Sequence, residues 1–140
     1  MNKKALSAHA AIAAAAIALV ATGCGVGEPT AEGKIATAAD DYLRALAEDD
    51  TAKACAHLTA TAKSELDRPC DDELHQVASR IGSDALSAAA DGGVDVTVDG
   101  THGFAKIRDL DGARLTFAKA GTEWLITSGH ALHARGEETS

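Results

Sequence analysis

The chain has 140 residues and a formal net charge of -8 at pH 7, with 46% apolar and 24% charged residues. This balance is typical of a globular protein, and the length is that of one domain. The acidic charge argues against nucleic-acid binding, which needs clustered lysine and arginine. No second long apolar run follows the one near the amino terminus, which excludes a protein with several membrane spans.

The amino terminus has the pattern of a signal peptide. Lys3 and Lys4 precede an alanine-rich apolar run over 5–21, which is about the shortest length that can span a bilayer. The run ends in Ala-Thr-Gly followed by Cys24, which resembles the lipobox of bacterial lipoproteins. The alternatives are an ordinary membrane anchor, or a secretory peptide in which Cys24 has no role.

The lipobox resemblance implies that Cys24 receives a diacylglycerol and becomes the first residue after cleavage. We therefore expect residues 1–23 to be a lipoprotein signal peptide. Two or three acyl chains, palmitate among them, would hold the protein on the extracytoplasmic face of the cell membrane. The stretch 24–34 is rich in glycine and is predicted to be a flexible tether.

Helices are predicted first along the mature chain. Apolar residues recur with the helical period over 35–46, so we expect a long helix with one apolar face. A second helix is predicted over about 51–58, and Thr59 can cap a short third one that ends before Pro69. Two more are expected, at 71–82 and 83–90.

Strands are predicted after these helices. Four stretches alternate between apolar and other residues: 94–98, 104–108, 114–118 and 124–126. Short glycine-containing turns join them, which indicates an antiparallel four-stranded meander. Helices followed by a sheet indicate an α+β domain, over 35–129, in which the helices cover the apolar face of the sheet. Residues 130–140 are predicted to be a polar tail.

Cys55 and Cys70 are left once Cys24 is assigned to lipid. Two cysteines of an exported protein usually pair, so we predict a disulfide between the second helix and the start of the fourth. In the chain-entropy model, a loop of this size contributes about 3 kcal/mol. The alternatives are a redox pair, which more often has the spacing Cys-x-x-Cys, and a metal site, which would need more soft ligands.

Several landmark stretches carry a second resemblance: DYLRAL at 41–46, ACAHLT at 54–59, the later Cys70, and GTEWLI at 121–126. The chain is similar, over about 35–128, to small actinobacterial lipoproteins with a nuclear-transport-factor-two-like, or cystatin-like, domain. This resemblance implies a curved sheet wrapped around a long helix as a cone, with room for a pocket between them. Members of this fold include ketosteroid isomerases, dehydratases and proteins with no known chemistry, so the fold does not establish an activity.

Four side chains are candidates for such a pocket. Tyr42 lies on the apolar face of the first helix, His57 near the end of the second, and Asp109 and Trp124 on the inward phase of their strands. A buried tyrosine or aspartate could polarise a ligand carbonyl. Three of them also have an ordinary role: core packing for Tyr42, a helix-end histidine for His57, and a turn residue for Asp109. Trp124 would line the outer face if the strand had the opposite phase.

We expect an exported, lipid-anchored lipoprotein of the cell envelope whose small domain binds an apolar ligand or an envelope protein without catalysis. No phosphate loop, nucleophile elbow or zinc motif is present, and we expect no metal and no cofactor. The alternatives are a ketosteroid isomerase-like or dehydratase-like enzyme, and a structural envelope protein with no pocket. An open cone with Tyr42 and Asp109 facing inward would favour the enzyme, whereas a closed, alanine-filled cone would rule out both hypotheses that need a pocket in the cone.

Overall fold

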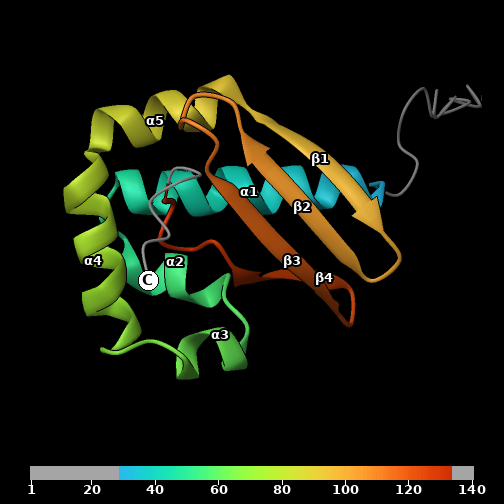
Figure 1. Cartoon of the computed structure of the whole chain (residues 1–140), viewed down its shortest axis with the longest axis horizontal. Helices are drawn as coiled ribbons and strands as arrows, with labels where there is room; N and C mark the ends of the chain where they lie inside the picture. The colour runs from blue at the N-terminus through green and yellow to red at the C-terminus, as the bar shows by residue number, and fades with distance from the viewer. Residues whose placement is uncertain (1–28, 134–140) are drawn as a thin grey trace, which may run out of the picture.

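The computed structural model describes residues 29–133. The predicted signal peptide, Cys24 and the last residues of the predicted tail therefore lie outside the described residues. Five helices precede a four-stranded antiparallel sheet, which confirms the α+β prediction (Figure 1). The elements are α1 (Ala31–Ala47), α2 (Thr51–Ala56), α3 (Ala60–Ser64), α4 (Cys70–Ile81), α5 (Ser83–Gly92), β1 (Val94–Asp99), β2 (His102–Ile107), β3 (Arg114–Ala120) and β4 (Glu123–Ser128). Among the residues described, no helix has both the length and the apolar character that a membrane crossing requires.

Helix α1 begins four residues earlier than the apolar period predicts. The side chain of Thr30 accepts a hydrogen bond from the backbone N–H of Gly33 at 3.1 Å, and such a cap sets the start of a helix. Residues 31–34, the last part of the predicted 24–34 tether, are therefore helical. The expected apolar face is confirmed, since its members are all buried: Ile35, Ala39, Tyr42, Leu43 and Leu46.

The sheet is a meander in which each strand pairs with the next along the chain, in the order β1-β2-β3-β4. Alternation predicts correctly which side chains face the helices, and these are buried: Ala105, Ile107, Leu115, Phe117, Trp124 and Ile126. Helix α1 lies across this face of the sheet (Figure 1). The side chain of Ile35 reaches Gly103 so closely that a Cβ atom there would collide with it, so glycine lets α1 approach β2.

Large side chains fill the space between α1 and the sheet. Each of the following is less than 2% exposed: Ile35, Tyr42, Leu43, Leu46, Ile107, Leu115, Phe117 and Ile126. The interior that the cone resemblance left open for a pocket is thus occupied by the hydrophobic core.

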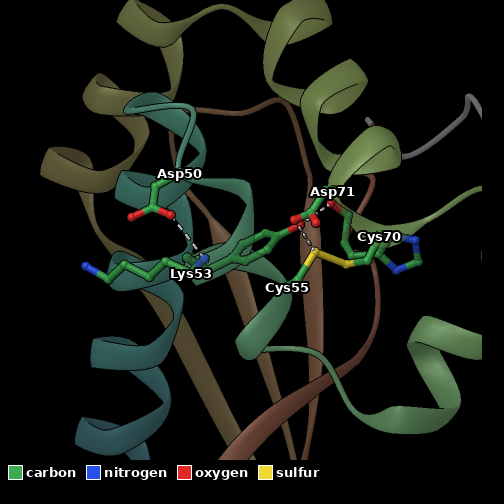
Figure 2. Close-up of a disulfide and its surroundings, with 7 residues drawn as sticks. Asp50, Lys53, Cys55, Cys70 and Asp71 are labelled. Atoms are coloured by element: carbon green, nitrogen blue, oxygen red, sulfur yellow. Dashed lines mark hydrogen bonds between the residues drawn. A yellow bond between two sulfur atoms is a disulfide. The ribbon is translucent and has the colours of Figure 1, made fainter.

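The predicted disulfide is present. Cys55 in α2 is bonded to Cys70, the first residue of α4, with the two Cα atoms 6.1 Å apart. Figure 2 shows this link, with the Asp71 carboxylate beside the sulfur of Cys55. The disulfide therefore joins two helices that are separated in the chain by α3.

The domain extends beyond residue 129, which corrects the predicted start of the polar tail. The Tyr42 hydroxyl donates a hydrogen bond to the backbone carbonyl of His130 at 2.6 Å, Arg80 donates to the carbonyl of Ala131, and Leu132 is only 5% exposed. Gly129 has a φ of 82°, a conformation that favours glycine. The chain turns there and brings the apolar Leu132 back onto the domain.

Candidate ligand-binding groove

A groove of about 440 Å³ opens at the surface where α1, α2 and β4 meet. It lies at the edge of the sheet and outside the filled core. Its wall combines polar and apolar side chains from elements distant in the chain: Lys34, Thr37, Ala38 and Asp41 from α1; Lys53, Ala56 and His57 from α2 and its end; Thr122–Leu125 from β4 and the turn before it; and Pro29.

Main-chain hydrogen bonds attach the end of α2 to β4. The N–H of Ile126 donates to the carbonyl of His57 at 2.7 Å, and the N–H of Thr59 donates to the carbonyl of Ile126 at 3.0 Å. Leu58 thus forms a parallel bridge with Ile126. At the other end of α2, the Asp50 carboxylate accepts from the N–H of Lys53 (Figure 2). Together with the disulfide, these contacts hold α2 as one wall of the groove.

His57 lies half-buried in this wall. Its ring meets that of Tyr42 edge to face, with 6.4 Å between the centroids. Desolvation lowers the pKa of His57 from its ordinary value, and the carboxylates of Asp41 and Glu123 oppose this effect. The imidazole is therefore mainly neutral at pH 7 and offers one hydrogen-bond donor and one acceptor.

Trp124 is the second predicted pocket residue that lines the groove. It is 6% exposed and has the same inward phase as Ile126, as alternation predicts. It is the only tryptophan of the sequence. One side chain is therefore part of both the core and the groove wall.

Four charged side chains surround the groove, two of each sign: Lys34, Lys53, Asp41 and Glu123. Within residues 29–133, the ion pairs involve other residues. The groove thus offers two ammonium groups and two carboxylates that are not paired with one another.

The structure does not bring Tyr42 and Asp109 to this site. Tyr42 is fully buried, its hydroxyl is used by His130, and burial raises its pKa above the ordinary range. Asp109 is exposed, because β2 ends at Ile107 and the chain turns after it. Its carboxylate lies against Gly92. The inward-facing site that would have combined Tyr42 with Asp109 is not formed, and both have the ordinary role described above.

Most residues of the groove carry no signal in the sequence. The helical period places Asp41 on the solvent face of α1, and nothing local distinguishes Lys34, Ala38 or Lys53 from other surface residues. They form a site only because α2 and β4 pack beside α1. No pattern within one element could have revealed them.

Within the described part of the chain, no group of three or more histidine, cysteine, aspartate or glutamate side chains could hold a metal ion. No family model, curated protein or solved structure matches the chain. The resemblance to cystatin-like lipoproteins therefore stays a prediction from sequence.

Proposed function

We propose that this protein is an exported, lipid-anchored lipoprotein of the cell envelope whose domain binds a small, partly apolar ligand in the groove, without catalysis. The groove carries this proposal. Its volume of about 440 Å³ falls within the roughly 300–1,000 Å³ typical of ligand sites. Trp124, Ala38 and Leu125 supply apolar surface beside charged groups, a combination that suits an amphipathic small molecule.

Export and anchoring are supported by two independent features. The Cys55–Cys70 disulfide is of the kind that persists in oxidising compartments. The leader ending at Cys24 supports lipidation, and cleavage there removes Lys3 and Lys4, so the mature chain is more acidic still. Anionic lipid repels such a body. The acyl chains, rather than the surface of the domain, would then hold the protein at the membrane.

Binding is favoured over catalysis because the groups that the sequence offers for carbonyl polarisation do not share a site. Tyr42 donates its hydrogen bond within the core, and Asp109 lies in a turn beside Gly92. An enzyme of the ketosteroid isomerase or dehydratase type would need such groups to converge on one substrate.

The binding proposal is tested with the full-length protein in detergent and anilinonaphthalene sulfonate, an apolar dye with one negative charge. The measured signal is energy transfer from Trp124 to the dye. Because the efficiency of transfer falls steeply with distance, dye bound in the groove contributes more to this signal than dye in the micelles. Ala56, exposed in the groove wall, is changed to Phe to fill the groove, and the exposed Ala88 of α5 is changed to Phe as the matched control. We expect saturable transfer in the wild type and in Ala88→Phe, and loss of it in Ala56→Phe. Equal transfer in all three proteins, or no saturable transfer in the wild type, would contradict the proposal.

A further inference from the structure

We propose that the ligand is a short peptide with free ends, a dipeptide or tripeptide, which adds to the open edge of β4 beside Trp124. This inference rests on the proposed ligand-binding function of the groove and names the class of its ligand. Three features support it: unused main-chain groups, the short length of the open edge, and the charges around it.

The main chain of β4 has hydrogen-bonding groups that face away from the sheet. β4 is an edge strand, and the N–H and carbonyl of Ile126 point outward, because they bond to His57 and Thr59. Outward groups recur at every second residue of an antiparallel strand, so those of Trp124 point to the same side. Within residues 29–133, Trp124 makes no main-chain hydrogen bond outside the sheet. One donor and one acceptor are therefore open in the groove wall.

The protein already uses this edge in the way that we propose for the ligand. Residues 57–59 pair with Ile126 as an added piece of parallel strand. An extended peptide beside Trp124 would use the same edge in the mode known as strand addition, and it would run antiparallel to β4. Its side chains would contact the apolar atoms of Trp124, Ala38 and Leu125.

The open edge is short, and this limits the length of the ligand. At one end, the bridge between Leu58 and Ile126 closes the edge. At the other end, the turn at Gly121 closes it, since β4 begins at Glu123. The three residues between these limits span about 10 Å. Two or three peptide residues can pair with this length of edge, and an extended segment that continued past Ile126 would collide with residues 57–59.

The charges of the groove complement free peptide ends. Lys34 and Asp41 lie on the same helix, two turns or about 10 Å apart, and both line the groove. An extended tripeptide places its ammonium and carboxylate groups a similar distance apart. We assign the carboxylate to Lys34 and the ammonium group to Asp41, with Lys53 and Glu123 as further charges of each sign. An internal segment of a protein would bring neither terminal charge.

The first experiment uses the full-length protein and the tripeptide Ala-Leu-Ala, with binding measured by calorimetry and by the fluorescence of Trp124. We expect saturable binding that Ala56→Phe abolishes and Ala88→Phe leaves unchanged. Methylation of the leucine amide nitrogen of the peptide removes a donor from its main chain, and we expect this to weaken binding about tenfold. Equal affinity of the methylated peptide would overturn strand addition.

The second experiment pairs blocked peptides with charge variants. Acetylation of the peptide amine should weaken binding to the wild type. The Asp41→Asn variant should bind the acetylated and the free peptide with equal affinity. Amidation of the peptide carboxylate should behave in the same way with Lys34→Gln. A doubly blocked peptide that binds as tightly as the free one would show that the site takes internal segments, and the inference would be wrong. If the dye binds and the tripeptide does not, this inference fails while the proposed function stands; if neither binds, both fail.

Discussion

Trp124 links the stability of the domain to its proposed function, because it is part of both the core and the groove wall. Changing it to Ala should lower the free energy of unfolding by about 3–5 kcal/mol, the usual cost of truncating a buried aromatic side chain. This is a large share of the roughly 5–15 kcal/mol that stabilises a typical domain. Denaturation followed by circular dichroism measures the loss, and Trp124→Phe serves as a milder control.

The fluorescence of the wild type provides a second measurement of Trp124. Since the residue is 6% exposed and is the only tryptophan, we expect a blue-shifted emission that acrylamide quenches poorly in the folded protein. Quenching as efficient as that of free tryptophan, together with normal folding of Trp124→Ala, would contradict the burial of this side chain.

The buried Tyr42 should make the free energy of unfolding depend on pH in the alkaline range. Burial raises its pKa from the ordinary 10.0, so the folded state favours the protonated phenol, which donates to His130. This contribution to stability is fully present below pH 10 and decreases above it, because the unfolded chain ionises there and the folded one does not. In Tyr42→Phe, the free energy of unfolding should lack the alkaline decrease that Tyr42 causes. At neutral pH it should be about 1 kcal/mol lower than in the wild type.

The ultraviolet absorbance of tyrosinate gives a direct check, since Tyr42 is the only tyrosine. In the folded protein, no tyrosinate should form near pH 10, and its appearance at higher pH should coincide with unfolding. Reversible ionisation near pH 10 with the fold intact would show that the phenol is accessible to solvent.

At the scale of elements, α2 and α3 are too short to be stable alone. Helix α2 has 6 residues and α3 has 5, and isolated helices of this length do not persist in water. Packing, the Asp50 cap and the Cys55–Cys70 disulfide therefore keep α2 in place. Because α2 carries Lys53 and leads into His57, its position affects the groove as well as the stability.

Replacing both cysteines of this disulfide with serine should lower the free energy of unfolding by about 2–5 kcal/mol and weaken binding of the tripeptide. Peptide mapping without reduction should find Cys55 linked to Cys70 in the exported wild type. Reduction of the wild type should reproduce the effect of the double variant. Free thiols at both positions in the exported protein, or unchanged stability after reduction, would contradict a structural role.

For the molecule as a whole, we predict attachment to the membrane through lipid on Cys24. This residue lies outside the described residues. Cells given a palmitate analogue should label the wild type, because the lipobox resemblance makes Cys24 the acceptor. Cys24→Ala should abolish the label and release or stall the protein. Cys55→Ser is the control that keeps the label. Equal labelling of the wild type and Cys24→Ala would contradict lipid anchoring at Cys24.

The sequence alone predicts the elements of this protein well, and the reason is local. Hydrophobic period reflects which side of an element is buried, so the apolar face of α1 and the inward phase of Leu115, Phe117, Trp124 and Ile126 are all predicted correctly. The pairing of Cys55 with Cys70 is also predicted correctly, once Cys24 is assigned to lipid and the protein is taken to be exported. Boundaries are less well predicted, because the cap at Thr30 and the glycine at 129 depend on hydrogen bonds and on packing.

The site was decided by the tertiary structure. The periodicity of apolar residues assigns Tyr42 and Asp109 to the interior of the domain. It cannot show that core side chains fill this interior, or that β2 ends before Asp109. The groove brings together three elements that are far apart in the chain, and Lys34, Asp41 and Lys53 have no local signal in common. The sequence determines which side chains each element buries, whereas the packing of α1, α2 and β4 determines which exposed ones meet.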